Sequence, residues 1–168
     1  SKAIALAIRE YIEKITGIKA SIKWPNDILI NGSKIAGVLI ENQWKNEKLS
    51  SSIIGIGLNV NQVVFSGLEN VISLKNLTSK VYNLSSILKS LCSSLDTQFS
   101  RLRNFDIFEI DRQYHSFLFN HNQWSNYEKN KINFKGKLIK VDPFGKMVLE
   151  LENGDKKSFE IKEINLLK

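Results

Sequence analysis

Two lysines, an asparagine and an aspartate lie close together between residues 23 and 39. The run reads Lys-Trp-Pro-Asn-Asp-Ile-Leu-Ile-Asn-Gly-Ser-Lys-Ile-Ala-Gly-Val-Leu. Asn31-Gly32 is typical of a type I′ turn, so residues 27–30 and 34–41 are expected to pair as an antiparallel hairpin. A cluster of cations, an acid and an amide beside such a turn suits the handling of an anionic substrate. The residues expected to converge there are Lys23, Asn26, Asp27 and Lys34.

Two motifs in this region resemble the central signature of biotin protein ligases, the enzymes that attach biotin to a carboxylase subunit. The first is Lys-Trp-Pro-Asn-Asp, followed after the short hairpin by Lys-Ile-Ala-Gly-Val-Leu. The second is Gly-Ile-Gly-Leu-Asn-Val at residues 55–60, which is similar to the Gly-x-Gly-x-Asn strand of that family. The resemblance covers essentially the whole chain, but its specific motifs all lie between Lys23 and Val60.

The resemblance implies a two-step reaction. Biotin and MgATP would give biotinyl-5′-adenylate and pyrophosphate, and a lysine of a biotin carboxyl carrier protein domain would then attack the adenylate. The expected cofactors are therefore ATP and Mg²⁺, the partners are biotin and the carrier domain, and no metal site is expected in the protein itself.

Lys34 is the expected catalytic cation, because charge grows on the oxygens around the α-phosphorus as the acyl-phosphate bond forms. In the matching family this lysine contacts the biotin carboxylate and the α-phosphate. A preorganised donor aimed at such charge is typically worth roughly 3–4 kcal/mol of the barrier. Gly37 follows closely and permits a ligand to approach the backbone. Outside such a motif, Lys34 would be read as an exposed strand lysine.

Asp27 is the second expected catalytic residue. It could orient Lys34 or accept a proton from the attacking lysine of the carrier. The alternative is turn chemistry, since Asn26 and Asp27 after Pro25 are ordinary turn residues.

The remaining candidates are binding residues for biotin or the adenylate. Lys23 and Asn26 flank the turn, and Trp24 could wall the site, although a tryptophan on a buried strand often only packs. Asn59 resembles the family's residue near the adenine, where an amide can donate and accept at once. Its alternative role is a strand-end cap.

The elements that must position these residues follow from hydrophobic periodicity. Isoleucines at helical spacing predict an amphipathic helix over residues 1–16, ended by Gly17, and residues 18–60 predict three or four antiparallel strands. Residues 62–80 predict a loop with a short helical turn near Leu74. Two further amphipathic helices are expected, over residues 84–102 and 105–119.

Beyond a polar stretch at residues 120–130, short strands alternate with turns such as Asn153-Gly154. The predicted fold class is α+β. Residues 1–126 would form part of a class II synthetase-like biotin ligase catalytic domain, an antiparallel sheet with helices. Residues 127–168 would form a small SH3-like β-barrel, which the resemblance supports because biotin protein ligases carry such a barrel at their C-terminus.

Composition limits the other possibilities. The net charge is +7, but the lysines alternate with acids as on a solvated surface, so nucleic-acid binding by this portion is not expected. Cys92 has no partner for a disulfide, and His115 and His121 lack companions at metal-ligand spacing. No apolar run is long enough to cross a membrane. A cytoplasmic protein is expected, and a homodimer is one of the partners considered.

Residues 1–22 contain no Gly-Arg-Gly-Arg-x-Gly loop of the kind that covers biotin and the adenylate in the family. The chain also begins with Ser1 and has Met147 as its only methionine. We therefore expect the C-terminal part of a ligase, inactive by itself. Two alternatives stay open: a lipoate or octanoate ligase or transferase, against which residues 24–27 argue, and a non-catalytic module that binds protein or nucleic acid.

Overall fold

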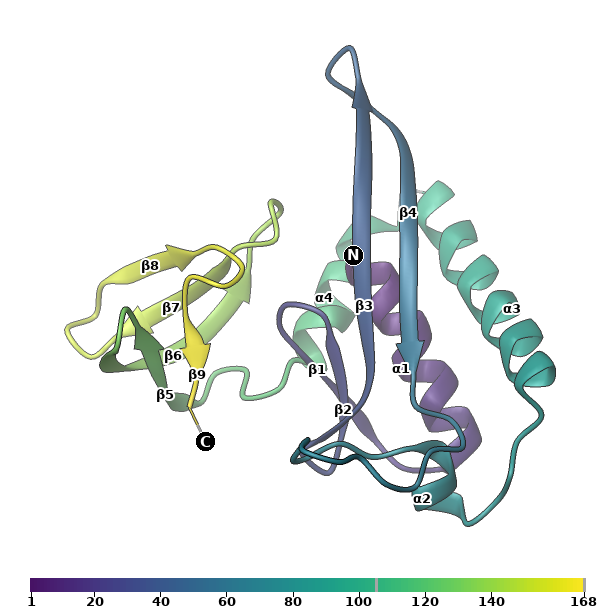
Figure 1. The fold of residues 1–168 in the computed structure, drawn as a ribbon. Coiled ribbons are helices and arrows are strands. Elements are labelled where there is room, and N and C mark those ends of the chain that lie inside the picture. The colour runs from purple at the N-terminus through teal and green to yellow at the C-terminus, as the bar shows by residue number, and fades with distance from the viewer. Residues whose placement is uncertain (105, 168) are drawn as a thin grey trace. The chain divides into compact units, whose positions relative to one another are not determined.

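The structure is a computed structural model that describes residues 1–104 and 106–167, except for the side chain of Trp44. Its chain divides into two compact units, residues 1–114 and residues 115–168 (Figure 1). The first unit contains every residue of the two sequence motifs. Among the described helices, none has the length and apolar composition that crossing a membrane requires.

The first unit begins with the predicted helix, α1 (Lys2–Thr16). Its isoleucines recur every fourth residue, so they fall on one face, and Ile4, Ile8 and Ile12 are buried there. Gly17 ends the helix in the left-handed region with φ 70°, and its N–H donates to the carbonyl of Glu13. The prediction for this helix and its C-terminus is confirmed.

Four antiparallel strands follow in the spatial order β1-β2-β3-β4: β1 (Ala20–Lys23), β2 (Asp27–Ile30), β3 (Ser33–Lys45) and β4 (Lys48–Leu58). One face of this sheet carries buried apolar residues, including Ile22, Ile28 and Val38. α1 contacts β1 and β2, which gives this face its cover. β3 and β4 are much longer than β1 and β2 and continue as a two-stranded ribbon (Figure 1).

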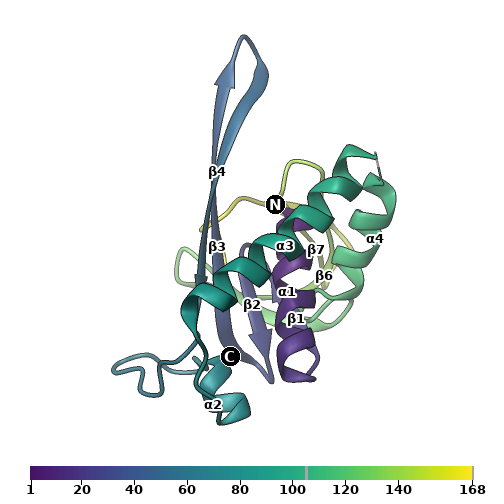
Figure 2. The same ribbon diagram turned by 90° about the vertical axis from the view of Figure 1, so that its right-hand side faces the viewer.

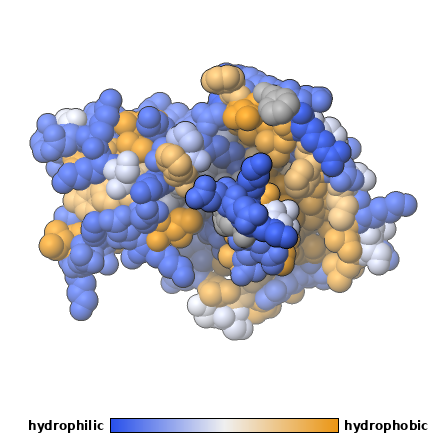
Figure 3. All heavy atoms as spheres, turned by 90° about the horizontal axis from the view of Figure 1, so that it is seen from above, coloured by the Kyte–Doolittle hydropathy of each residue, from blue (hydrophilic) through white to orange (hydrophobic). Residues whose placement is uncertain are grey.

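Three helices follow the sheet: α2 (Leu74–Thr78), α3 (Leu84–Arg103) and α4 (Ile107–Ser116). The first unit ends within α4, at Tyr114. α3 and α4 lie where periodicity predicted helices, although Phe105, the predicted start of the last helix, is outside the described residues, and α2 is the short helical turn expected near Leu74. α3 lies against α1 (Figure 2). Its apolar stripe is only partly covered: Leu91 is buried, whereas Leu84 and Leu88 are 61% and 62% exposed. On the face seen from above in Figure 3, patches of hydrophobic residues (orange) lie between hydrophilic residues (blue).

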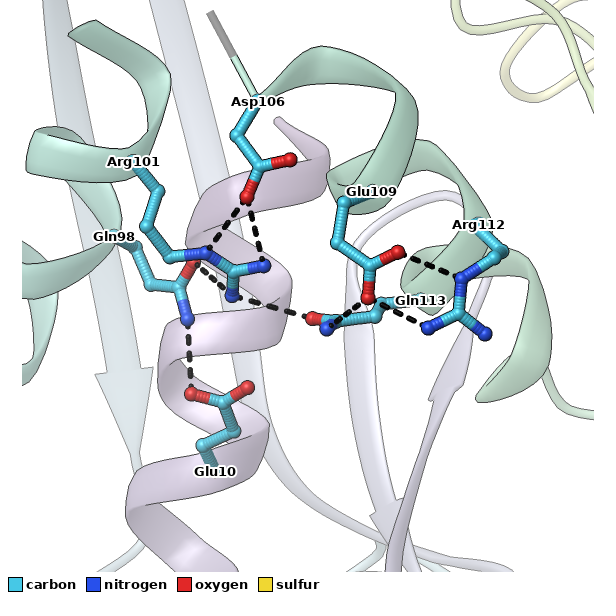
Figure 4. Close-up of polar contacts among 7 residues, drawn as sticks. All are labelled: Glu10, Gln98, Arg101, Asp106, Glu109, Arg112 and Gln113. Carbon is cyan, nitrogen blue, oxygen red and sulfur yellow. Dashed lines mark hydrogen bonds and ion pairs between the residues drawn. The ribbon is translucent and has the colours of Figure 1, made fainter. Parts of the chain in front are cut away.

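A chain of polar contacts ties α1, α3 and α4 together (Figure 4). Gln98, which is 2% exposed, donates to Glu10 at 2.9 Å and accepts from Arg101 at 3.3 Å. Arg101 also donates to Gln113 at 3.2 Å and pairs with Asp106 at 3.3 Å. The buried Gln98 amide therefore has partners on both sides, as stable packing requires of a buried polar group.

The second unit is an antiparallel sheet in the order β8-β7-β6-β5-β9. Its strands are β5 (Trp124–Lys129), β6 (Ile132–Val141), β7 (Met147–Leu151), β8 (Lys156–Phe159) and β9 (Asn165–Leu166). The predicted closed barrel is not found: in the described residues, β8 pairs only with β7, and the two-residue β9 pairs only with β5. Phe134 of β6 stacks on Tyr127 of β5 and on Phe159 of β8, so side-chain contacts link these three strands.

Part of the polar stretch at residues 120–130 is a strand, which the sequence analysis missed. Residues 124–129 form β5, whose Tyr127 is 1% exposed while the side chains around it are polar. Its two aromatic residues, Trp124 and Tyr127, are three positions apart, so the six residues show no alternation that would mark a strand. The predicted domain boundary after residue 126 falls inside β5, and the compact units divide after residue 114. His115 contributes to the second unit because its Nε2 accepts from the N–H of Val141 at 2.9 Å.

Candidate active site

The candidate site is built on the β2–β3 hairpin. Asn31 and Gly32 have φ values of 49° and 76°, the positive values that a type I′ turn requires, so the predicted hairpin is confirmed. Asparagine and glycine tolerate this backbone region at little cost, which is why the pair fixes the turn.

A bulge in β3 brings Lys34 onto the same face of the sheet as Gly37. Between the pairs Asp27–Gly37 and Leu29–Lys34, β2 advances by two residues while β3 advances by three. Side chains of a regular strand alternate between faces, so residues three apart would otherwise point to opposite faces. The extra residue is the fully buried Ile35. The bulge therefore redirects Lys34 to the face that carries Asp27.

Lys34 and Asp27 form an ion pair, with Nζ 2.6 Å from Oδ1. The side chain of Lys34 is 44% exposed and that of Asp27 is 23% exposed. Oδ1 itself is shielded from solvent, yet it accepts no hydrogen bond of good geometry from the described residues. The contact is therefore electrostatic, and the lysine ammonium, which has three N–H donors, can still turn toward a further oxygen.

Gly37 provides the space in which the Lys34 side chain lies. A Cβ atom at position 37 would be 3.2 Å from both Cε and Nζ of Lys34 and 3.4 Å from Oδ1 of Asp27. Any larger residue would push the end of the Lys34 side chain aside by a few tenths of an ångström, so glycine permits the observed position of the ion pair.

The same face continues as exposed glycine backbone beside the ion pair. Gly37 pairs with Gly57, and Leu39 pairs with Gly55. A Cβ atom at Gly57 would meet nothing closer than the carbonyl oxygen of Gly37 at 3.9 Å. A flat ligand can therefore approach the strands directly, within reach of Lys34.

Three more predicted residues surround the hairpin. Lys23 is the cross-strand partner of Asp27 in β1 and is half-buried. Asn26 donates from Nδ2 to the carbonyl of Val38 at 2.7 Å, and its own carbonyl accepts from the Val38 N–H at 2.9 Å. Trp24, joined to Pro25 by a cis peptide, is only 8% exposed. Asn26 thus anchors the turn to β3, and the Trp24 side chain packs in the interior.

Asn59 lies just after β4, where it contacts the segment at residues 70–74. Its backbone N–H donates to the carbonyl of Ile35 at 2.9 Å, and its carbonyl accepts from Leu74 at 3.0 Å. Its side-chain Nδ2 donates to the carbonyl of Ile72 at 3.1 Å. In this structure Asn59 therefore links the end of β4 to the loop at residues 70–74.

The sequence analysis missed the segment at residues 70–72. The N–H of Lys34 donates to the carbonyl of Asn70 at 2.7 Å, and the N–H of Ile72 donates to the carbonyl of Lys34 at 2.9 Å. These two bonds make a short parallel bridge between Lys34 and Val71. The available signal was the Ser73–Asn76 capping box, which fixes the start of α2 and hence the end of this segment.

Comparison with known proteins adds independent information. The Biotin/lipoate A/B protein ligase family matches residues 1–59, which include the hairpin and Asn59. The bifunctional ligase/repressor BirA of Bacillus spizizenii is 30% identical over 161 residues, covering 92% of this chain and 49% of the relative. The crystal structure of biotin protein ligase from Aquifex aeolicus superposes with a TM-score of 0.79 at 25% identity, covering 99% of this chain and 73% of that one. Together the three comparisons support a biotin protein ligase.

A shorter match has a higher sequence identity. BirA of Bacillus subtilis is 55% identical over 58 residues, which are 34% of this chain and 18% of that relative. The Aquifex aeolicus ligase has also been solved in complex with biotin and ATP, and that structure has a TM-score of 0.78 to this chain at 25% identity. The chain spans about half the length of the Bacillus spizizenii relative.

Proposed function

We propose that this chain supplies the lysine-bearing part of a site that forms biotinyl-5′-adenylate from biotin and MgATP. The observation that carries the proposal is the Lys34–Asp27 ion pair beside open glycine backbone, within the region that matches the family. A partly exposed ammonium with donors to spare is suited to bind the biotin carboxylate and then the α-phosphate as charge develops between them.

Asp27 has two roles in this proposal. In the free protein its carboxylate attracts the Lys34 ammonium across 2.6 Å and keeps it over Gly37. In the second step the carboxylate accepts a proton from a lysine amine of a biotin carboxyl carrier protein domain as that amine attacks the acyl carbon of the adenylate; the amide bond forms, the acyl–phosphate bond breaks and AMP leaves. Protonation of the carboxylate would release Lys34, because the attraction between them depends on both charges.

The remaining predicted residues support the ligands. Lys23 adds a second positive charge on the face that carries Asp27, which favours the triphosphate. Asn26 and Trp24 shape the turn beside it. Gly37 and Gly57 have no side chains, so the fused rings of biotin can lie against the strand backbone at these two residues.

The direct test is an adenylation assay with the intact gene product. Pyrophosphate release should depend on both biotin and ATP, and the product should label a carrier-domain lysine. Octanoate and lipoate serve as competing acids, because the lipoate alternative predicts that they replace biotin. Activity with either acid but not with biotin would refute the biotin assignment, and no release with any acid would refute adenylation.

The polypeptide of residues 1–168 is expected to form little adenylate by itself. Its sequence contains no Gly-Arg-Gly-Arg-x-Gly run to cover the intermediate, and water must be excluded from an acyl-adenylate. Calorimetry with biotin at micromolar protein should show weak binding, alongside a carrier-labelling assay. Tight binding or multiple turnovers by residues 1–168 would contradict this part of the proposal.

A further inference from the structure

The second unit has a groove on one face of its sheet, with a volume of about 690 Å³. Strand pairing sets which side chains face it. Ile132 and Phe134 of β6 are two residues apart and share that face, and Leu151 of β7 joins them because it pairs with Gly136. Ile132 is 70% exposed. The groove therefore has an apolar floor that solvent reaches.

Lysines dominate the charge of this groove. Its charged lining residues are Lys129, Lys135, Lys157 and Glu152. Lys129 forms an ion pair with Glu163, and Nζ of Lys135 is 4.0 Å from Oε1 of Glu152. Lys157 has no ion-pair partner among the described residues. The groove therefore combines apolar surface with positive charge that is not fully compensated, and such a surface attracts an acidic group.

β8, the strand along one wall of the groove, has an open edge. It pairs with β7 and with no other strand in residues 106–167. Such an edge offers backbone N–H and C=O groups to a further strand. Lys157 and Phe159 both belong to β8 and both line the groove. A strand added to this edge would therefore run along the groove.

We propose that this groove, together with the open edge of β8, binds an extended acidic segment of another protein. The segment adds to β8 as a strand, so that its backbone bonds to the edge and its alternate side chains face the groove. Acidic side chains then lie beside Lys157, and apolar ones lie against the floor.

Single-stranded nucleic acid fits this groove less well. It binds by stacking bases on open aromatic faces. Phe134 already stacks on Tyr127 and on Phe159, with ring centroids 5.8 Å apart in both pairs, and Phe159 is only 5% exposed. The proposal does not depend on adenylation, because every residue that it uses belongs to the second unit.

Peptide binding to the 168-residue chain tests the charge requirement. The probe is a short fluorescein-labelled peptide that alternates glutamate with valine, and its control has lysine in place of glutamate. The acidic peptide should bind at least about tenfold more tightly than the basic one at low ionic strength, and added salt should reduce the difference. Equal affinity for the two peptides, or no binding of the acidic one, would overturn the proposal.

Matched variants separate the groove from the general positive charge of the chain. Lys157→Glu should weaken binding of the acidic peptide by about tenfold or more, because it reverses a charge in the groove. Lys140→Glu makes the same change at an exposed lysine of β6 outside the groove and should keep the affinity within about twofold. Ile132→Ser should weaken binding by roughly three- to tenfold through lost apolar contact. Equal losses in the two lysine variants would overturn the proposal.

Amide hydrogen exchange tests the addition of a strand. Amides of β8 should exchange at least about tenfold more slowly when the acidic peptide is bound, while amides of β1 and β2 keep their rates. Unchanged exchange in β8 would overturn the proposal, because a peptide held only by side chains leaves that edge open. A short thymidine oligonucleotide is the competitor. If it binds more tightly than the acidic peptide, the groove is a nucleic-acid site and the proposal is wrong.

Discussion

Two ion pairs of equal length in this protein differ in how fully the carboxylate of each pair is hydrogen-bonded. Lys34 and Asp27 are separated by 2.6 Å, as are Arg112 and Glu109 in α4. Glu109 accepts from two nitrogens of Arg112, at 2.6 and 2.7 Å, and from Gln113 at 2.6 Å (Figure 4). Hydrogen bonds from Arg112 and Gln113 lower the pKa of its carboxyl to about 2.

Asp27 receives no such set of hydrogen bonds. Its shielded Oδ1 accepts none of good geometry from the described residues, and its only ion-pair partner there is a lysine that is 44% exposed. A carboxylate whose oxygens are fully hydrogen-bonded holds a helix in shape, whereas one with a movable ammonium as its partner can exchange that partner for a ligand. The two pairs have the same length, so we propose that unused hydrogen-bonding capacity, and not distance, is what suits the Lys34–Asp27 pair to bind a ligand.

The largest effect on the adenylation rate is expected from removing Lys34, the cation of the Lys34–Asp27 pair. Lys34→Ala should slow biotinyl-5′-adenylate formation by roughly 100- to 1000-fold, because one preorganised donor to the developing charge is lost. Pyrophosphate release under saturating substrates measures it. Lys48→Ala, which removes an exposed lysine from β4, is the control and should change little. A Lys34→Ala protein that is active within a few-fold of wild type would show that the Lys34–Asp27 pair, like the Arg112–Glu109 pair, is not needed for adenylation.

Asp27→Asn should impair transfer from preformed adenylate by roughly 100-fold, at least as much as it impairs adenylation, because asparagine cannot accept the proton of the attacking amine. Single-turnover transfer to a carrier domain measures this step separately. Asp155→Asn, in the exposed turn before β8, is the control. Normal transfer would show that Asp27 is not the proton acceptor, and its remaining role would be to orient Lys34.

Gly37→Ala should lower the adenylation rate by roughly tenfold, less than loss of the lysine itself. The added Cβ would lie 3.2 Å from Nζ of Lys34, and the flexible end of that side chain can move aside by a few tenths of an ångström. Thermal stability should stay near wild type for the same reason. Kinetics and a melting curve together check both statements; wild-type activity would show that the position of Nζ is not critical.

The smallest effect is expected at the hydrogen-bonded carboxylate, and it concerns stability only. Because the pKa of Glu109 in the folded protein is about 2, below the ordinary 4.5, its ionised form stabilises the fold above pH 4.5, and this contribution is lost as the pH falls toward 2. Glu109→Gln should therefore lower Tm slightly at pH 6, with the difference disappearing near pH 2. The effect is small because the pair is solvent-exposed. Glu47→Gln is the control. A lower adenylation rate for Glu109→Gln would contradict the expectation that the Arg112–Glu109 pair affects stability only.

Local chemistry made much of the molecule predictable. The isoleucine spacing of α1, the Asn31-Gly32 turn and the apolar runs of α3 and α4 each favour one local structure, and each was found. The closed barrel and the missing β5 were not predicted correctly, because both depend on which strands meet in space. β5 is held by burial of Tyr127 and by pairing with β6 and β9, interactions that its own six residues do not reveal.

The sequence by itself determined which groups are present at the site: two lysines, an aspartate and an asparagine around a hairpin whose turn it also specifies. Only the tertiary structure decided that Lys34 and Asp27 face each other. Strand periodicity puts Lys34 and Gly37 on opposite faces, and the bulge at Ile35 reverses that. That bulge is enclosed by Asn59 and residues 70–72, which lie far along the chain, so its free energy depends on contacts that no local pattern encodes.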